Sequence, residues 1–312
     1  MALQIVSPRV GRVRERRVED RGAQSVADPA AARRSAWRTC PALLVLLQPG
    51  RSNTAVLQVA AELAPRWRSH VVGMGVAQIV PGVQGIGALD GTLLQQVHEE
   101  LQRELIEAED EFRRALGGRA ATLAWRTSLG LTPLVNFATE EARCADLLIT
   151  AAAPGDRLDF SRHLDAGTLV KQAGRPVLVV PAARTDAPLR HALVAWQDTP
   201  ESRRAVLDAL PLLQLAAQTT VAEIAAPQDA ERAQARLDDV CSWLLRHGVQ
   251  AQTALTLGTG SAGDAIDALV QDSGADLLVA GAFGHSRLRE WMMGGMTRDT
   301  LLQSTCSVLL SH

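Results

Sequence analysis

Tyrosine is absent from this 312-residue chain, and lysine occurs once, at Lys171, among 32 basic residues. This scarcity removes almost every candidate for catalysis by a lysine amine. No apolar run approaches the roughly 20 residues that a helix needs to cross a bilayer. The formal net charge of −2 gives no reason to expect nucleic acid as a partner. We therefore expect neither a membrane nor a specific nucleic acid among the partners.

Cysteine is also scarce, and its four residues are scattered without a CxxC pair: Cys40, Cys144, Cys241 and Cys306. This pattern favours reduced, buried thiols in a cytoplasmic protein over a disulfide framework or a zinc site. Neither His163 nor His191 has a second histidine at metal-ligand spacing, so no metal site is predicted.

Residues 1–38 differ from the rest of the chain in composition. They hold nine arginines and four acidic residues with few large apolar side chains, so they bury too little surface to offset the entropy of ordering. They also lack the 7–15-residue apolar core of a secretion signal. We expect a disordered tail or a start codon set too early. A basic arm that contacts nucleic acid is the less favoured alternative.

From about residue 40, short apolar segments alternate with longer amphipathic ones. Apolar runs of strand length fall at 42–47, 69–77, 121–127, 145–151 and 175–181. Helical spacing of apolar residues, three and four apart, falls at 54–64, 92–116 and 131–143. Buried strands that alternate with helices predict a parallel sheet covered on both faces.

The same pattern then repeats. Segment 42–57 aligns with 192–207, 145–151 with 275–281, and 176–180 with 307–311. Between the first two matches the offset falls from 150 to 130 residues, so the first copy is about twenty residues longer. We place the extra residues around the Gly-rich segment 78–91.

This duplication predicts an α/β protein made of two tandem, doubly wound, open parallel sheets of five strands each, packed as a pseudo-dimer. The expected boundaries are a tail at 1–38, a first domain at 39–181, a linker at 182–188 and a second domain at 189–312.

The stretch "GAFGHSRLREWMMGGMT" at 281–297 contains four glycines close to the end of the second copy. Gly281 ends the fourth expected strand of that copy, and Gly294, Gly295 and then Thr297 open its last helix. Ligands of open parallel sheets bind beyond the carboxyl ends of the strands. A helix N-terminus there offers free N–H groups, and glycine lets the backbone approach a phosphate. The stretch is either a phosphate cradle or a turn.

The pattern strand–Gly–x2–Gly–x9–Gly–small hydroxyl resembles the nucleotide-binding signature of the universal stress protein family. The segment "VAWQDTPESRRAVLDALPLL" and the ending "TCSVLL" are also similar to that family, and the resemblance covers about residues 40–312. It implies a Rossmann-like fold of the adenine nucleotide alpha hydrolase type that binds ATP or AMP, with Mg²⁺. It implies adenine contacts near Gln197 and Ile224. It implies phosphate and ribose contacts at Gly281, Gly284, Gly294, Gly295, Met296 and Thr297.

Two positions of the second copy depart from the family pattern. Gln197, followed by Asp198, replaces the usual acidic residue after the first strand, and Gly295 replaces a small hydroxyl residue. The carboxamide of Gln197 still offers hydrogen bonds to adenine or ribose. One lost neutral hydrogen bond costs about 0.5–1.5 kcal/mol, so these changes weaken nucleotide binding without abolishing it.

The first copy departs further, because it replaces the motif glycines. Gly281, Gly284 and Gly294 align with Ala151, Pro154 and Leu164, or with His163 at the last position if the gap lies earlier. Proline has no N–H, and leucine adds bulk where the backbone would approach phosphate. We predict that the nucleotide site of the first copy is lost.

Other residues near the motif have simpler interpretations. Met292, Met293 and Met296 are expected to pack at a domain or subunit interface. Arg287 either stays exposed or closes on phosphate. Trp196 is expected in the core. The letters "GTGSAG" at 258–263 match GxGxxG but follow the third strand of their copy, so we interpret them as a strand-to-helix turn.

Enzyme chemistry finds little support in the sequence. There is no GxxxxGK[ST] motif, no SGGxDS-like run, and no nucleophile with an identifiable base. No catalytic residue is predicted. We expect a tandem universal-stress-type protein that responds to nucleotide, either as a homo-oligomer or as an intramolecular pseudo-dimer. The alternatives are an enzyme of related fold that hydrolyses ATP slowly or transfers adenylyl groups, and an interaction protein without a ligand.

Overall fold

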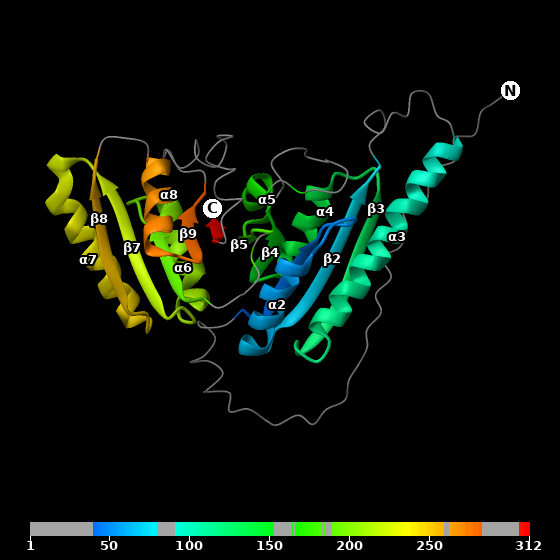
Figure 1. Ribbon diagram of the computed structural model, residues 1–312, viewed down its shortest axis with the longest axis horizontal. Helices are drawn as coiled ribbons and strands as arrows, with labels where there is room; N and C mark the ends of the chain where they lie inside the picture. Colours follow the sequence, from blue (N-terminus) through cyan, green and yellow to red (C-terminus); the bar gives the residue numbers. More distant parts are fainter. Residues whose placement is uncertain are drawn as a thin grey trace.

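A computed structural model describes residues 40–79, 91–152, 164, 166–182, 184, 189–258, 262–282 and 306–312. Its elements form two successive series of alternating strands and helices, which lie side by side in Figure 1. The expected tail, the segment 80–90 and most of the expected linker lie outside the described residues. No helix in the described ranges is long and apolar enough to span a membrane.

The first series contains β1 Ala42–Leu47, α2 Thr54–Trp67, β2 His70–Gln78, α3 Gly91–Leu116, β3 Thr122–Gly130, α4 Leu134–Glu141, the 3₁₀ turn η1 Ala142–Cys144, β4 Leu147–Ala151, α5 Ala166–Ala173 and β5 Val177–Val180. The second series contains β6 His191–Ala195, α6 Pro200–Leu213, β7 Gln218–Ala225, the 3₁₀ turn η2 Pro227–Asp229, α7 Ala230–Arg246, β8 Ala251–Leu257, α8 Ala262–Ser273, β9 Leu277–Gly281 and β10 Ser307–Ser311. Every strand and helix expected from the sequence in these ranges is present.

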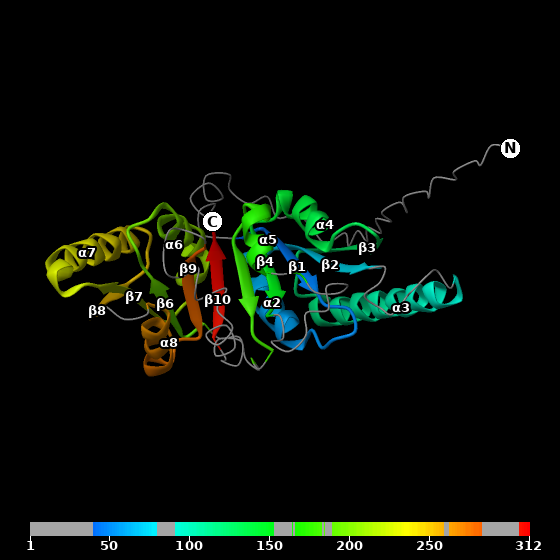
Figure 2. The ribbon, with the colours of Figure 1, turned by 90° about the horizontal axis from the view of Figure 1, so that it is seen from above.

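All ten strands belong to one sheet, in the order β3-β2-β1-β4-β5-β10-β9-β6-β7-β8. Neighbouring strands are parallel within each half, as expected. The halves meet where β5 and β10 pair antiparallel, with Leu178 opposite Leu309, and Figure 2 shows β10 between β9 and the first half. The expected two separate sheets are therefore five-stranded halves of one continuous sheet.

Helices cover both faces of this sheet, because its strands are apolar on both sides. One core cluster joins α2, α3, α6 and α7 to the sheet, and the other joins α4, α5 and α8. Both clusters contain strand residues of the two halves. The paired edges of β5 and β10 are thus covered on both faces and form part of the core.

The strand pairing also fixes how the two copies correspond. Leu43 pairs with Leu147 in the first half, and Ala192 pairs with Leu277 in the second. Leu43 therefore corresponds to Ala192, which is an offset of 149 residues instead of the 150 expected from the letters. The offset of 130 at β4 and β9 is retained. This one-residue correction makes Gln48 the counterpart of Gln197.

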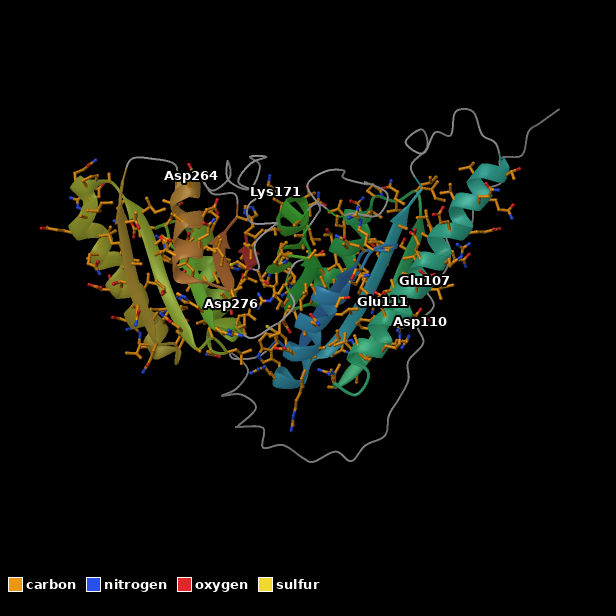
Figure 3. All side chains as sticks on the ribbon, viewed as in Figure 1. Glu107, Asp110, Glu111, Lys171, Asp264 and Asp276 are labelled. Atoms are coloured by element: carbon orange, nitrogen blue, oxygen red, sulfur yellow. The ribbon has the colours of Figure 1, made fainter. Side chains whose placement is uncertain are left out.

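The extra length of the first copy is not confined to the segment 78–91. Helix α3 has 26 residues, whereas its counterpart α7 has 17. The middle of α3 packs Leu101 and Leu105 against Ala77 in a small separate cluster. Figure 3 marks Glu107, Asp110 and Glu111 among the acidic residues of α3, and Lys171 on α5. Much of the insertion therefore lengthens a helix at the β2–β3 end of the sheet.

Candidate functional site

A pocket lies beyond the carboxyl ends of β6, β7 and β9. Its wall is formed by the end of β6 and the start of α6, two residues of β7, one residue of α8 and the last residue of β9: Ala195, Trp196, Gln197, Thr199, Glu201, Ser202, Ala222, Ile224, Ile266 and Gly281. The structure thus brings together the three expected site residues that it describes, Gln197, Ile224 and Gly281. Gly284, Gly294, Gly295, Met296 and Thr297 lie outside the described residues, as do Met292, Met293 and Arg287.

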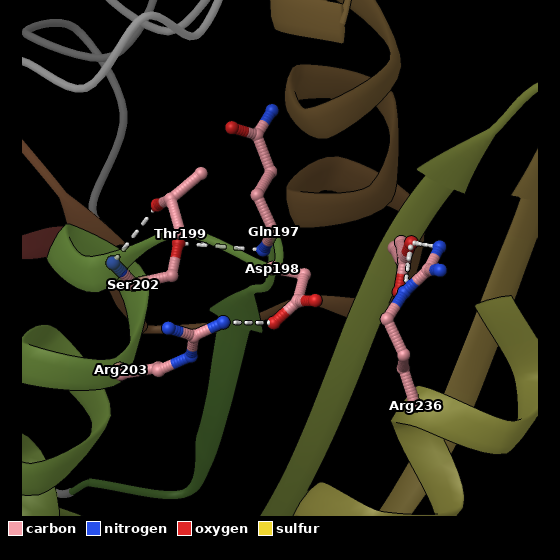
Figure 4. Close-up of polar contacts among 7 residues, drawn as sticks. Gln197, Asp198, Thr199, Ser202, Arg203 and Arg236 are labelled. Carbon is pink, nitrogen blue, oxygen red and sulfur yellow. Dashed lines mark hydrogen bonds and ion pairs between the residues drawn. The ribbon is translucent and has the colours of Figure 1, made fainter.

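The N-terminus of α6 forms one side of the pocket and is well defined. Thr199 is the N-cap residue, and its hydroxyl accepts a hydrogen bond from the backbone N–H of Ser202 at 3.3 Å. Pro200 follows at the first helical position, where its missing N–H costs nothing. The Ser202 hydroxyl accepts from the backbone N–H of Gln197 at 3.3 Å (Figure 4). These contacts hold the loop between β6 and α6 in one conformation.

Gln197 presents its side chain to the pocket. In Figure 4 its carboxamide extends away from the ion pair that Asp198 forms with Arg203 at 2.5 Å. Within the described part of the chain, no hydrogen bond is recorded for this carboxamide. A half-buried amide with free donors and an acceptor suits recognition of a polar ring edge or a sugar hydroxyl. The Asp198–Arg203 pair is more than half exposed and contributes little stability.

Gly281 has a structural reason to be glycine. A Cβ atom at this position would lie 2.6 Å from the backbone carbon of Glu201 and 2.7 Å from the nitrogen of Ser202. The end of β9 therefore approaches the first turn of α6 more closely than a side chain permits. This glycine would be required for packing even if no phosphate bound here.

The rest of the pocket wall is apolar. Ile224 on β7 and Ile266 on α8 belong to the α8 side of the sheet, together with Ala195 and Ala222. The described wall contains one carboxylate, Glu201, and no cationic side chain. Such a surface suits a flat, mostly apolar ring with polar edges better than it suits a phosphate group.

A buried ion pair behind this wall did not emerge from the sequence. Glu223 on β7 is only 6% exposed, and both of its carboxylate oxygens accept hydrogen bonds from Arg236 on α7. The hydrogen bond to Glu223 raises the pKa of Arg236. The sequence does contain a signal for this ion pair. Glu223 is the one charged residue in the run "TTVAEIA" (219–225), and a charge inside a buried strand requires a partner.

The corresponding loop of the first half is held by its own side chains. The Asn53 side-chain oxygen accepts from the backbone N–H of Gln48 at 2.8 Å, repeating the contact between Gln197 and Ser202. Its amide also donates to the Gln48 carbonyl at 3.2 Å and to Glu111 on α3 at 3.4 Å. Gly50 has a φ of 71°, and a Cβ there would lie 2.7 Å from a carboxylate oxygen of Glu104. Helix α3 therefore packs against the loop that would admit a ligand.

The remaining positions of that copy are only partly described. Ala151 ends β4 opposite Val180, as Gly281 ends β9 opposite Ser311. Leu164 packs at the edge of the core, whereas Pro154 and His163 lie outside the described residues. The predicted loss of the first site therefore stays a prediction.

Three smaller expectations can be compared with the structure. Trp196 is 7% exposed, which confirms its place in the core. Cys40 and Cys306 are buried and Cys241 is half-buried, but Cys144 is exposed, so the expectation of buried thiols is wrong there. The exposure arises because Cys144 ends a 3₁₀ turn at the surface. Strand β8 ends at Leu257 and helix α8 begins at Ala262, so the expected turn lies between a strand and a helix, although residues 259–261 lie outside the described residues.

Comparisons with known proteins agree with this architecture. Residues 188–312 match the universal stress protein family. A comparison with curated proteins gave no match. A universal stress protein from Archaeoglobus fulgidus DSM 4304 has a similar structure, with a TM-score of 0.65 and 14% identity over 86% of this chain and 95% of that one.

A functionally unknown protein from Pseudomonas aeruginosa PAO1 is also similar in structure, with a TM-score of 0.52 and 18% identity over 89% of this chain and 94% of that one. At these identities the two structures establish the fold across both halves. The family match adds that the C-terminal half, residues 188–312, is similar to the universal stress protein family.

Proposed function

We propose that this protein is a cytoplasmic stress-response module that binds ATP or AMP, with Mg²⁺, in its C-terminal half and does not turn the nucleotide over. The observation that carries the proposal is the pocket that joins Gln197, Ile224 and Gly281 at the carboxyl ends of β6, β7 and β9. Ligands of open parallel sheets bind at this edge. The family match of residues 188–312 supports the same location.

The described wall offers apolar and hydrogen-bonding groups of the kind that bind the base and ribose of a nucleotide. Ile224 and Ile266 supply apolar surface for adenine, and the Gln197 carboxamide supplies hydrogen bonds to its edge or to the ribose. The phosphate contacts are assigned by the family resemblance to Gly284, Gly294, Gly295, Met296 and Thr297. That part of the proposal depends on the motif alone.

Hydrolysis is not expected, because the hydroxyls nearest the pocket already have structural roles. Thr199 accepts a hydrogen bond as the N-cap, and Ser202 accepts one from Gln197. Glu201 is the one carboxylate of the described wall, and it lies in the first turn of α6. Turnover of Mg-ATP above about one per second, the ordinary enzyme range, would favour the enzyme alternative instead.

Calorimetry of the full chain with ATP tests the proposed single site. We expect one equivalent of nucleotide per chain, because Asn53 holds the corresponding loop of the first half and Glu104 and Glu111 of α3 lie against that loop. Two equivalent sites per chain would contradict the proposal. Mass spectrometry of the denatured protein then identifies any nucleotide that copurifies, and repeated absence of nucleotide together with no binding of ATP would favour a ligand-free interaction protein.

Three substitutions test the phosphate motif, with titration of a fluorescent ATP analogue as the measurement. Gly294→Val should abolish binding while the fold persists, since a side chain there pushes phosphate away. Thr297→Ala should weaken binding by about 1 kcal/mol, the loss of one hydrogen bond. Gly295→Ser should tighten it, because it restores the hydroxyl that the family pattern contains. Unchanged binding by Gly294→Val with a sharply lower melting temperature would make these glycines structural.

The assembly of the protein is also a proposal. We propose that the antiparallel pairing of β5 with β10 makes each chain an intramolecular pseudo-dimer, since it joins the same edge strand of both copies. Sedimentation equilibrium distinguishes this monomeric pseudo-dimer from a homo-oligomer of the chain.

A further inference from the structure

The first half contains a second cavity, far along the sheet from the proposed nucleotide pocket. It has a volume of about 230 Å³ and lies against the amino ends of β1 and β2, beside the end of α4. Its lining comes from these elements, from Arg126 on β3 and from the turn that follows α4: Ala42, Leu43, Leu44, His70, Val72, Arg126, Glu140, Glu141, Arg143, Cys144 and Ala145. A cavity needs only about 10–15 Å³ to hold one water molecule, so this one has room for a small organic molecule.

The second half fills the corresponding place with a histidine. By the strand pairing, Ala42 corresponds to His191, and Val72 corresponds to Thr220. The correspondence is supported by Asp146 and Asp276, whose carboxylates accept from the backbone N–H groups of Ala42 and His191 at 2.9 and 3.3 Å. Asp276 is marked in Figure 3.

The His191 ring bridges two elements of its half. Its Nδ1 donates to the Ser273 carbonyl at 3.0 Å, since a carbonyl only accepts. Its Nε2 lies 2.8 Å from the Thr220 hydroxyl, and the ring is 9% exposed. The first half has Ala42 and Val72 at these two positions and Arg143 in place of Ser273. The cavity therefore lies at the position that corresponds to the His191 imidazole of the other copy.

The cavity has an apolar floor and a charged rim. Leu44, Val72 and Ala145 contribute to the floor, and they are also part of the core or packed against it. Arg126 is paired with Glu141. Arg143 and Glu140 are exposed, and in the described part of the chain no hydrogen bond or ion pair is recorded for the guanidinium of one or the carboxylate of the other.

We propose that this cavity binds a small zwitterion with an apolar side chain, namely a free aliphatic α-amino acid. Arg143 offers a planar fork of donors to the carboxylate, and guanidinium–carboxylate hydrogen bonds are among the stronger polar contacts in proteins. Glu140 offers an acceptor to the ammonium group, and the apolar floor receives the side chain. The volume lies below the roughly 300–1,000 Å³ of sites for drug-sized ligands, so the ligand is no larger than an amino acid.

Isothermal calorimetry on the full chain tests the proposal with three probes that share one hydrocarbon body. L-Leucine carries both charges, 4-methylpentanoate carries only the carboxylate, and 3-methylbutylamine carries only the ammonium group. We expect leucine to bind at one equivalent per chain, with a Kd at least tenfold lower than that of either analogue. Absence of leucine binding, or equal affinity for leucine and one analogue, overturns the proposal.

Two variants assign the charges to residues. Arg143→Gln should raise the Kd for leucine at least tenfold, and Glu140→Gln should do the same. The matched controls are Arg232→Gln and Glu231→Gln, two exposed residues of α7 in the other half, and they should bind leucine like the parent. Unchanged leucine affinity in Arg143→Gln refutes the assigned carboxylate contact.

A third variant closes the cavity by copying the second half. Ala42→His with Val72→Thr places an imidazole and a hydroxyl where His191 and Thr220 lie, and leucine binding should be lost. Circular dichroism verifies the fold of this variant, and the single variants keep the test decisive if it does not fold. Leucine should also slow alkylation of Cys144, the exposed thiol in the cavity lining. Unchanged alkylation at saturating leucine would place the ligand elsewhere and refute this site.

Discussion

Replacing Gly281 by alanine tests whether this glycine is needed for packing or for binding a ligand. The added Cβ would lie 2.6 Å from the Glu201 backbone carbon and 2.7 Å from the Ser202 nitrogen, whereas ordinary van der Waals contact begins near 3.4 Å. Either the end of β9 or the first turn of α6 must therefore move by several tenths of an ångström. The first turn of α6 resists this movement, because Thr199 and Ser202 fix it through their hydrogen bonds.

The expected cost is about 1–3 kcal/mol, the usual range for forcing an extra carbon into a packed interior. The clash is with backbone atoms, so no side-chain rotation relieves it. In a domain of 150–250 residues each kcal/mol corresponds to a shift in melting temperature of roughly 2–4 °C. Gly281→Ala should therefore melt measurably below the parent in the absence of any nucleotide.

Urea unfolding followed by circular dichroism measures this difference. Gly130→Ala is the matched control, because Gly130 also ends a strand and a Cβ there would meet no atom within 4 Å. It should unfold like the parent. If Gly281→Ala unfolds at the same urea concentration as the parent while binding ATP more weakly, the packing argument is wrong and Gly281 serves the ligand.

Three further outcomes are expected. Arg236→Ala should destabilise the fold by about 2–3 kcal/mol in urea unfolding, because it leaves the buried Glu223 carboxylate without its partner. The double variant Glu223→Leu/Arg236→Met removes both charges, and an equally large loss of stability in it would contradict this reason. Burial raises the pKa of Cys40 and of Cys306 from about 9 to about 12. The folded state therefore keeps protons that the unfolded state loses above pH 9, and stability should fall between pH 9 and 12 by up to about 1.4 kcal/mol per thiol per pH unit. This dependence of stability on pH should be weaker in the double variant Cys40→Ala/Cys306→Ala. An unchanged dependence would refute its assignment to these two thiols. Iodoacetamide at pH 8 should label Cys144 well before Cys40 or Cys306, as read by peptide mass spectrometry, since only the first thiol is exposed.

Much of the fold could be predicted from the sequence, because it depends on local patterns. Segments such as Ala42–Leu47 are buried on both faces, so their residues are apolar without interruption. This continuous run distinguishes a buried parallel strand from an amphipathic helix. The duplication could be recognised for the same reason, since each copy repeats the same order of buried strands. The three described pocket residues, Gln197, Ile224 and Gly281, were found by their positions at strand ends and through the family resemblance.

The register between the copies shows where sequence patterns lose resolution. Offsets of 149 and 150 residues each align five of the six residues of β1 with apolar letters, because every residue of β1 and β6 except the first of β1 is buried. A strand that alternates polar and apolar residues would have distinguished the two. Only the pairing of Leu43 with Leu147 and of Ala192 with Leu277 fixes the correspondence.

By itself, the sequence determined which segments become strands and helices, that they occur twice, and which strand ends carry the polar residues of the proposed site. Tertiary structure alone decided three things: that β5 and β10 join the copies into one sheet, that Gly281 touches the start of α6, and that Ala42 opens a cavity where His191 fills one. The physical reason is that local periodicity follows from the burial of each segment. A backbone contact or an empty volume depends instead on atoms that are distant in the chain.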